Sequence, residues 1–443
     1  MKLMPMGISN RLFYYTSAGE ELSFDFCYHF ELQERLDRGA LSAAAEKALR
    51  NFPEFAIRPV VHDNGIWAVP NHGPVSLLED EPEKVRHYGT EETGGYLFFF
   101  RCREKGFSFP YFHGMTDFYG VWHFLRTLFY YYAQERGLAV QPDEFVRTDP
   151  AQGVAEDETE WLDPYVKFAP PEQDGTAAKP QPVAGIFEIP ETYYGLGTPY
   201  CSGYEIRCPL RDFLQMVKQR GTSAVPFLAA LTSRAIADSY AWDGTPIRTM
   251  ASANMRKYYN ANTMVNFSDA TFLSYDRELA ALPMEEQAVR FRQDLKAQMT
   301  KEHFDPLIAQ KVKMVQGFSC GDNAGVPVAE WNRRFTQSPG EGAAPPMTVT
   351  LTYPGSLDLP EEYAPLLRRV TRSICIRGLN MSFCVFVSTY GDTMYIRSCQ
   401  RFDSDAVMQG IRKGLSEAGL STRMDTLDRY YGNQIVADRL QHV

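Results

Sequence analysis

Hydrophobic and polar residues alternate, or hydrophobic residues recur at helical spacing, along most of the first 112 residues. The alternation over residues 22–30 (LSFDFCYHF) predicts a β-strand, and the Ala- and Leu-rich stretch 36–51 predicts a helix that ends before Pro53. Four further strands are predicted, the first two as a hairpin around turn residues: 56–61, 65–69, 96–102 and 107–112.

The composition changes between about residues 148 and 182, where Asp, Glu, Gln, Pro, Gly and Ala predominate. This change predicts a linker or crossing loop. Strand and helix patterns then resume, with strands predicted over 203–208, 247–253, 347–353, 382–388 and 394–398, and helices over 210–220, 224–241 and 405–418. The sequence therefore predicts an α/β fold with α+β mixed sheets, divided into an N-terminal lobe (1–160), a linker (161–182) and a C-terminal lobe (183–443).

The composition is that of an acidic globular protein with a sizeable core. Of 443 residues, 44% are hydrophobic and 23% charged, and 55 acidic against 45 basic side chains give a net charge of −10. The chain has no long basic run, so nucleic acid is not an expected partner. It also lacks a secretory signal and an apolar run of about 18 residues, so we expect a cytoplasmic protein without a membrane span. The eight cysteines are scattered without a CxxC pair, which predicts reduced structural thiols and no metal site.

One segment, YFHGMTDFYGVWHFLRTLFYYYAQ (residues 111–134), combines a strand end, a His and a helix. Its helical part has apolar residues at Val121, Phe124, Leu125, Leu128, Phe129 and Tyr132, the spacing of one buried helix face. His113 therefore lies in a strand-to-helix turn, where an imidazole can take a proton from an alcohol or amine. The alternatives are that His113 is only packed and that Asp117 is an ordinary helix N-cap.

Three stretches resemble a known family when they are taken together and in order. They are the HxxxD pattern of His113 and Asp117 with Gly120, the run ANMRKYY…TMVNF (253–267), and TLTYPGS (350–356). These stretches are similar to motifs of the chloramphenicol-acetyltransferase-like superfamily, in its branch of condensation domains and alcohol acetyltransferase-like proteins. The similarity extends from about residue 11 to residue 420.

The resemblance implies two similar lobes with the active site in a tunnel between them. It assigns His113 as the catalytic base, Gly120 as part of the motif turn, and Arg256 as the salt-bridge partner of Asp117. Asn266 or Thr352 would contact the oxyanion or the acceptor. On residue type alone, Asn266 and Thr352 are better explained as strand-end polar groups with ordinary hydrogen bonds.

The reaction that the resemblance implies is direct acyl transfer from a thioester to a hydroxyl or amine, with no covalent enzyme intermediate. The expected donor is an acyl-CoA that acts as co-substrate, with an acetyl group as the expected acyl group and no bound cofactor. Candidate contacts for the coenzyme A phosphates are the basic pairs Lys311 and Lys313, Arg333 and Arg334, and Arg412 and Lys413.

Two alternatives stay open at this point. One is a condensation-domain-like protein that uses the thioester of an acyl carrier protein, and the other is a non-catalytic binder with the same fold. Phe118 follows Asp117 where many family members have Gly, and Tyr353 stands where Asn is common, so both departures favour the second alternative. A cysteine or serine hydrolase that uses His113 is disfavoured, because the chain has no GxSxG motif and no Cys in a nucleophile-like sequence context.

Overall fold

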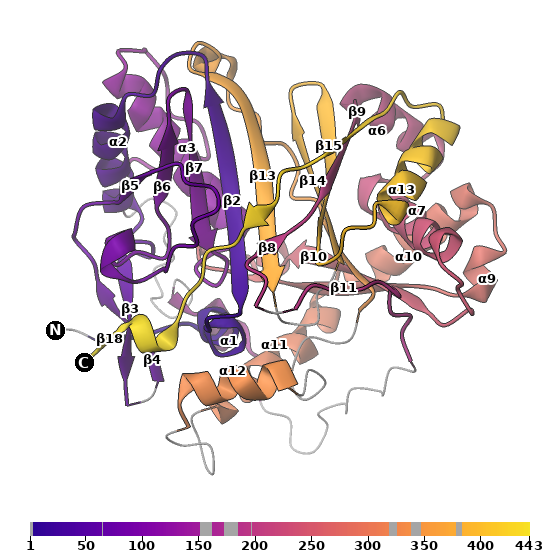
Figure 1. Cartoon of the computed structure of the whole chain (residues 1–443), viewed down its shortest axis with the longest axis horizontal. Coiled ribbons are helices and arrows are strands. Elements are labelled where there is room, and N and C mark those ends of the chain that lie inside the picture. The colour runs from indigo at the N-terminus through magenta and orange to yellow at the C-terminus, as the bar shows by residue number, and fades with distance from the viewer. Residues whose placement is uncertain are drawn as a thin grey trace.

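The structure is a computed structural model that describes residues 3–63, 65–150, 162–171, 185–195, 197–318, 326–337, 347–377 and 383–443. Two lobes lie side by side, each with a central sheet and helices on its outer side (Figure 1). The predicted mixture of helices and mixed sheets is confirmed. Within the described residues, no helix is both long and apolar enough to cross a membrane.

The N-terminal lobe is built on a five-stranded sheet in the order β13-β2-β7-β6-β5. Helices α2 (Arg38–Asn51) and α3 (Phe118–Glu135) cover its outer face, where Phe30, Phe109 and Phe124 belong to one aromatic core. The five strands are β13 (Leu367–Arg377), β2 (Ser23–Leu32), β7 (Gly106–Phe112), β6 (Phe100–Arg103) and β5 (Leu77–Glu79). A smaller sheet contains β1 (Met4–Pro5), β4 (Gly65–Pro70), β3 (Ile57–His62) and β18 (Gln441–His442).

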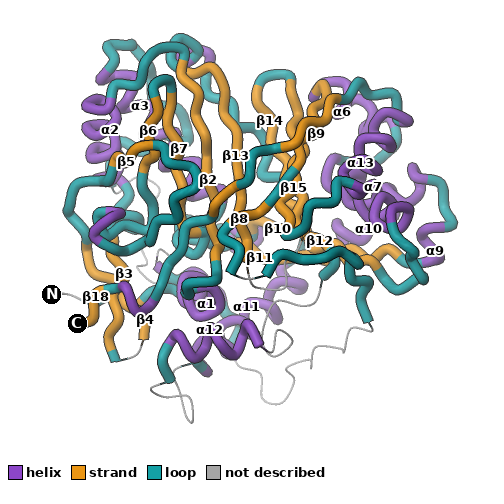
Figure 2. The backbone as a smooth tube through the Cα atoms, viewed as in Figure 1, coloured by secondary structure: helices purple, strands orange, loops and turns teal. Residues whose placement is uncertain are grey.

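The C-terminal lobe is built on a seven-stranded sheet in the order β11-β10-β12-β14-β15-β9-β16. Its strands are β11 (Ser268–Tyr275), β10 (Ile247–Asn254), β12 (Val349–Thr352), β14 (Phe383–Tyr390), β15 (Thr393–Gln400), β9 (Tyr204–Pro209) and β16 (Arg423–Thr426). Helices pack on the side away from the other lobe, as Figure 2 shows. These helices are α6 (Leu210–Gln219), α7 (Ala224–Ser239), α10 (Met284–Gln298) and α13 (Ala406–Glu417).

The remaining elements are further helices, a strand pair and turns. They are α1 (Ile8–Ser17), α5 (Pro164–Phe168), α8 (Arg256–Tyr259), α9 (Arg277–Ala280), α11 (Lys301–Gly317), α12 (Val328–Gln337), the pair β8 (Tyr200–Cys201) and β17 (Tyr430–Tyr431), and 3-10 turns at Glu91–Thr93, Glu361–Tyr363 and Ala437–Arg439. Figure 1 shows α1, α11 and α12 below the two sheets and α9 at the outer edge of the C-terminal lobe.

Alternate residues of β14 face different cores, which brings the two lobes into contact. Val385 and Val387 pack with the helices of the C-terminal lobe. Cys384 and Phe386 instead join the aromatic core of the N-terminal lobe. Because successive strand residues point to opposite faces, β14 presents one face to each lobe.

Strand pairing crosses the predicted lobe boundaries. β13 pairs with β2 from Val370↔Phe30 to Arg377↔Ser23, and β18 pairs with β3, so the first lobe takes two strands from residues 183–443. The alternation within a strand predicts that it is a strand, but it does not identify the strand's partner. The predicted linker includes α5, which Asp163 caps, whereas residues 161 and 172–182 lie outside the described part.

Most of the predicted elements agree with the structure to within a few residues, including the hairpin β3–β4 and helix α3. The strand predicted over 96–102 is regular only from Phe100; before it, Phe98 forms an isolated bridge to Tyr111 of β7. Elements β11, β13, α1, α10 and α11 were not predicted. The cysteines of the described part are free and buried, as expected, and Cys320 lies outside it.

Candidate active site

His113 lies in the loop that joins the end of β7 to α3. Its backbone N–H donates to the Phe24 carbonyl of the neighbouring strand (3.0 Å), which continues the sheet hydrogen bonding by one residue. Its Nδ1 is 2.9 Å from the Thr116 carbonyl oxygen. A carbonyl oxygen can only accept, so Nδ1 carries the proton and Nε2 keeps its lone pair. This tautomer suits a general base.

Aromatic rings surround the half-buried His113 imidazole. The ring centroids of Phe26, Phe24 and Phe13 lie 4.1, 5.0 and 5.6 Å from its own. Phe24 and Phe26 come from alternate positions of β2, on the face that packs against α3. The ring is therefore held in one orientation by packing.

The surroundings lower the pKa of His113 to about 4. Burial is the main cause, and the positive charge of Arg372 lowers the pKa further. The hydrogen bond to Thr116 and the negative charge of Asp117 oppose this shift. The imidazole is consequently neutral at pH 7, as a proton acceptor must be.

The carboxylate of Asp117 accepts four hydrogen bonds, none of them from His113. Its Oδ1 accepts from Gly120 N (3.2 Å) and Arg256 Nη2 (3.1 Å), and its Oδ2 accepts from Arg256 Nη1 (2.7 Å) and Phe267 N (3.0 Å). Asp117 is thus the N-cap of α3 and also the partner of Arg256. The helix N-cap and the salt bridge to Arg256, the two roles that the sequence suggested for Asp117, are therefore both present.

Arg256 begins α8, just after β10 of the C-terminal lobe. Its Nε donates to the Thr263 carbonyl (2.8 Å) and its Nη2 to the Val265 carbonyl (2.7 Å). The Tyr119 ring lies 4.5 Å from the guanidinium carbon. Arg256 therefore fixes the 263–267 loop and the start of α3 against each other.

Gly120 is required because the start of α3 and the 263–267 loop approach each other closely. A Cβ at this position would overlap the Met264 carbonyl oxygen, which also accepts from the Thr116 hydroxyl (2.6 Å). The motif turn and the 263–267 loop therefore meet at backbone contact distance.

Asn266 and Thr352 have different surroundings. The buried Asn266 side chain accepts at Oδ1 from the backbone and hydroxyl of Ser268 (3.2 and 2.8 Å), so its carbonyl oxygen is used within its own turn. Thr352 is half-buried at the end of β12 and pairs in register with Phe386. Neighbours in register share a face, so Thr352 lies on the side of the sheet that faces the other lobe.

The two residues that depart from the family pattern lie away from the imidazole. Phe118 stacks on Trp122, with centroids 6.1 Å apart. Tyr353 packs against the core of the C-terminal lobe. Among the described residues, neither forms a ring contact with His113, so neither covers its ring.

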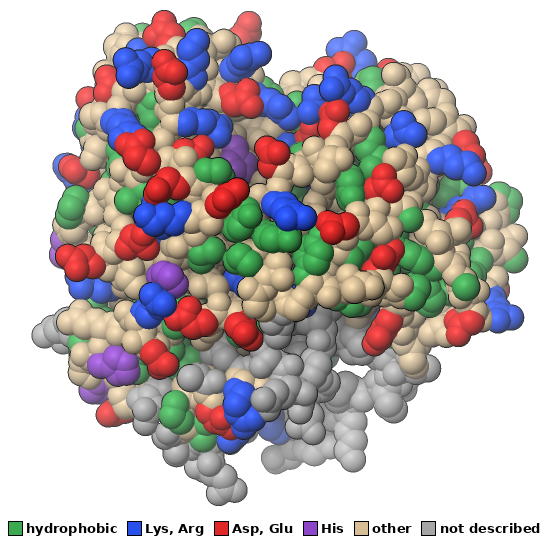
Figure 3. All heavy atoms as spheres, viewed as in Figure 1, with side chains coloured by type: hydrophobic (Ala, Val, Ile, Leu, Met, Phe, Trp, Pro, Cys, Tyr) green, Lys and Arg blue, Asp and Glu red, His purple; other side chains and the backbone are tan. Residues whose placement is uncertain are grey.

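The basic pairs singled out in the sequence are largely engaged by acids. Lys311 binds Asp269 (2.9 Å), and Lys413 approaches Glu417 at 3.8 Å. Glu330 pairs with both Arg333 (2.7 Å) and Arg334 (3.0 Å). Figure 3 likewise shows acidic and basic side chains interspersed over one face of both lobes.

Sequence analysis missed Arg372 of β13. This side chain is only 4% exposed and lies between the two lobes. Its strand has apolar residues at Val370, Ile374 and Ile376, so Arg372 is a charged residue at an inward position of the alternation. That break in the pattern is the signal that could have identified it.

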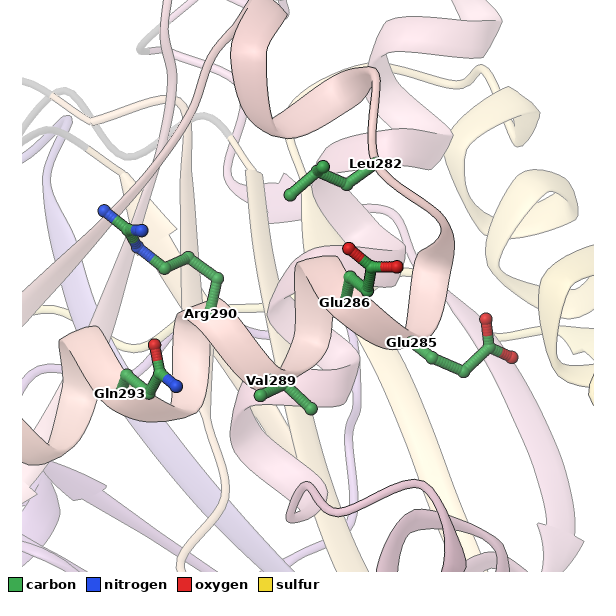
Figure 4. Close-up of a pocket in the computed structure, with 6 residues that line it drawn as sticks. All are labelled: Leu282, Glu285, Glu286, Val289, Arg290 and Gln293. Carbon is green, nitrogen blue, oxygen red and sulfur yellow. The ribbon is translucent and has the colours of Figure 1, made fainter.

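Two surface hollows lie elsewhere. One, of about 290 Å³ along α10, is shown in Figure 4 with its lining residues Leu282, Glu285, Glu286, Val289, Arg290 and Gln293. The other, of about 1010 Å³, is lined by charged groups near the start of α2, including Arg38, Glu79 and Arg136. His113 lines neither of them. Within the described ranges, no cluster of three or more His, Cys, Asp or Glu could hold a metal ion.

The chain is similar to known proteins in structure and not in sequence. No protein-family model matches the chain, and no curated protein matches it in sequence. The structure is similar to polyketide synthase associated protein 5 from Mycobacterium tuberculosis, with a TM-score of 0.59, 13% identity, and coverage of 94% of this chain and 96% of the other.

Three further structures illustrate the range of proteins with this fold. TRI101 of F. graminearum, in complex with coenzyme A and T-2 mycotoxin, gives a TM-score of 0.59 at 13% identity, over 95% of this chain and 100% of the other. The epimerization domain from the third module of tyrocidine synthetase B gives 0.58 at 11% identity, over 94% and 96%. The condensation domain of the polyketide synthase MokA is similar as well, with a TM-score of 0.54 at 11% identity, over 94% of this chain and 97% of the other. The chain therefore has the two-lobed fold of TRI101 and of condensation and epimerization domains, as the sequence resemblance implied.

Proposed function

We propose that the protein is an acyltransferase that moves an acyl group, with acetyl as the expected group, from acyl-CoA to the hydroxyl or amine of a small acceptor. The observation that carries this proposal is the 2.9 Å contact of His113 Nδ1 with the Thr116 carbonyl oxygen, from which we infer that Nε2 is left as an acceptor. The fold supports it, since TRI101 with the same fold has been seen with coenzyme A.

In the proposed reaction, Nε2 of His113 takes the proton of the acceptor as the acceptor oxygen or nitrogen attacks the thioester carbonyl. The tetrahedral intermediate then collapses, the C–S bond breaks, and the thiolate takes the proton back from the imidazolium. The acyl group never bonds to the protein, and no cofactor is needed. Positioned general-base catalysis of this kind contributes typically about 10² to 10⁴ in rate.

The low pKa of His113 fits the second half of this cycle. An imidazolium with a pKa of about 4 readily gives its proton to a thiolate, whose conjugate acid has a pKa near 8.5. The Thr116 carbonyl accepts from Nδ1 throughout and stabilises the charged form. Asp117 and Arg256 are proposed to hold the loop and to take no part in proton transfer.

We propose that the Thr352 hydroxyl stabilises the oxyanion. Thr352 is half-buried and faces the other lobe. Asn266 is only 2% exposed, and its side-chain oxygen accepts from Ser268, so only its amide N–H is left as a second candidate donor. A hydrogen-bond donor aimed at the developing negative charge lowers the barrier most in a site from which water is excluded.

A carrier-protein thioester is a second candidate donor, because condensation and epimerization domains share this fold. The chemistry at His113 would be the same. Phe118 and Tyr353, the two departures that favour a non-catalytic binder, form no ring contact with the imidazole among the described residues.

The test is release of free thiol from acetyl-CoA and longer acyl-CoAs across a panel of alcohols and amines. We expect acceptor-dependent release that falls about 10²- to 10⁴-fold in His113→Ala. His62→Ala is the control, since His62 lies on a surface hairpin and binds the Val443 carbonyl. Equal release by wild type and His113→Ala would contradict the proposed base. If acyl-CoA gives no release, the same panel with an acyl-loaded carrier protein decides between the two donors.

A further inference from the structure

Arg372 projects from β13 onto the same face of the sheet as the aromatic residues around His113. It pairs in register with Tyr28 of β2, and Ile374 pairs with Phe26, whose ring contacts the imidazole. Arg372 is 4% exposed, yet its positive charge reaches His113 and contributes to the low pKa of that residue. A charge this deeply buried requires compensation.

Arg372 has no such compensation within the described part of the chain. No carboxylate there forms an ion pair with Arg372, and its buried Nε and Nη2 have no hydrogen-bond partner. The Tyr28 hydroxyl interacts with Arg372, but a neutral phenol supplies no counter-charge. By contrast, buried Arg256 binds Asp117, and buried Arg397 binds Glu205. Arg372 is thus an exception to the pairing of buried cations at the interface between the lobes.

Three aromatic rings hold the guanidinium in place. The ring centroids of Tyr28 and Phe386 lie 5.8 Å from its central carbon, and that of Phe118 lies 6.0 Å away. Aromatic faces attract a cation, but they do not satisfy N–H donors. The three rings come from β2, from β14 and from the first residue of α3, so the guanidinium is fixed between the two lobes with unused donors.

Two of the rings around Arg372 belong to residues next to the proposed reaction centre. Phe118 follows directly after the His113 to Asp117 turn. Phe386 is the register partner of Thr352, the proposed oxyanion contact. The guanidinium therefore lies between the start of α3, which follows the His113 loop, and the strand pair that carries Thr352.

We propose that Arg372 binds a carboxylate of the acceptor, so that the acceptor is a hydroxy acid or an amino acid. This inference rests on the proposed function. Nε and Nη2 form one edge of the planar guanidinium, and that edge donates two parallel hydrogen bonds to a carboxylate. The bound carboxylate supplies the missing negative charge and orients the acceptor's hydroxyl or amine toward His113.

The chemistry of the donor favours the acceptor as the source of this anion. In coenzyme A the pantetheine arm separates the thioester from the phosphates, so an anion beside the reacting carbonyl does not come from those phosphates. A single guanidinium edge among aromatic rings also suits a monoanionic planar group better than a phosphate, which calls for more donors. The other possible source of this anion is a carboxylate on the acyl group of the donor. The experiment must distinguish it from a carboxylate on the acceptor.

The test compares acceptors that differ only in the acid group: 3-hydroxybutyrate with 3-hydroxybutyramide, L-phenylalanine with L-phenylalaninamide, and 3-hydroxybenzoate with 3-hydroxybenzamide. With acetyl-CoA, we expect wild-type kcat/KM to favour the acid of at least one pair by about tenfold or more. In Arg372→Gln the ratio should fall to near one, and in Arg372→Lys to an intermediate value. Arg368→Gln, exposed on the same strand, is the control and should keep the wild-type ratio.

A folded Arg372→Gln protein that keeps the preference overturns the inference, as does a wild type with none. A preference for malonyl-CoA over acetyl-CoA that is lost in Arg372→Gln, without any acceptor preference, also overturns it, because the anion would then belong to the donor.

A binding measurement separates this inference from the proposed function. If no acceptor turns over, thermal unfolding is followed with 3-hydroxybenzoate or 3-hydroxybenzamide present. Stabilisation by the acid alone, abolished in Arg372→Gln, supports the inference while the proposed function fails. Equal effects of acid and amide, or no effect of either, overturn it.

Discussion

Asp117 and Arg256 connect the two lobes through a two-point ion pair, with Nη1 to Oδ2 at 2.7 Å and Nη2 to Oδ1 at 3.1 Å. Asp117 begins α3 of the N-terminal lobe, and Arg256 follows β10 of the C-terminal lobe. Both side chains are buried, so each charge depends on the other. The pair therefore fixes the loop of His113 relative to the second lobe.

Asp117→Asn should lower the free energy of unfolding by about 3 to 5 kcal/mol, because it leaves Arg256 buried without its counter-charge. Thermal or urea unfolding measures the change. Asp238→Asn is the control, since Asp238 forms an exposed i,i+4 pair with Arg234 whose loss should cost about 0.5 kcal/mol or less. Equal stability of the two variants would contradict the structural role of the pair.

Gly120→Ala should destabilise the protein by roughly 2 to 4 kcal/mol, as expected when added atoms force a backbone shift in a packed site. The new Cβ would overlap the Met264 carbonyl oxygen and push the 263–267 loop away from α3. Gly317→Ala, near the end of α11 with nothing within 4 Å of its Cβ, should instead be neutral or stabilising by up to about 1 kcal/mol. Chemical unfolding of both variants tests the contrast.

Thr352→Ala should lower kcat about 10²-fold or more if its hydroxyl stabilises the oxyanion, with little change in stability. Thr352→Ser keeps the hydroxyl and should restore most of the activity. Steady-state rates with a saturating acceptor check this prediction. A Thr352→Ser variant as impaired as Thr352→Ala would show that the methyl group matters and the hydroxyl does not.

Activity should be insensitive to pH over the range from about 8 to 5 and should fall below about pH 5. The reason is that His113 must be neutral to accept a proton, and burial lowers its pKa to about 4. The measurement is kcat/KM for an alcohol acceptor between pH 4 and 8. An inflection near pH 6.5 would show that the imidazole in the free enzyme is not desolvated.

Stability should fall as the pH drops from about 6.5 toward 4. Burial lowers the pKa values of His29, His113 and His123 to about 3, 4 and 4, so the unfolded chain binds more protons than the folded one in this range. Each group contributes at most about 1.4 kcal/mol per pH unit. Asp25 acts in the opposite direction, because burial raises its pKa to about 6 and its contribution is lost as the pH rises through that value.

The denaturant midpoint measured across this pH range checks the stability prediction. The denaturant midpoint of His123→Gln should change less steeply with pH than that of wild type. The midpoint of His442→Gln, at an exposed position, should follow wild type. An unchanged slope in His123→Gln would show that His123 does not contribute.

The local elements around His113 could be predicted because their signals are local. The spacing of Val121, Phe124 and Leu128 determines which face of α3 is buried, and Asp117 before it marks the helix start. The division into two lobes could be predicted from the change of composition near residues 148–182, with strand and helix patterns on both sides of it. The pairing of Asp117 with Arg256 came from the family resemblance and not from spacing.

The roles of Arg372 and Asn266 could not be predicted in the same way. The direction of Arg372 depends on the register between β13 and β2, which are distant in the sequence, and on β14 covering it from the other lobe. The side-chain oxygen of Asn266 accepts a hydrogen bond from Ser268, only two residues away. The sequence alone cannot distinguish such a turn from an oxyanion contact. Both depend on the tertiary arrangement.

The position of β13 in the sheet of the N-terminal lobe also affects how the chain folds during its synthesis. During synthesis, β2 emerges early, but its β13 partner leaves the ribosome only after residue 377. Until then β2 has an unpaired edge rich in aromatic residues, which favours aggregation. We therefore expect slow, cooperative refolding of the whole chain, and insolubility of a fragment that ends in the predicted linker.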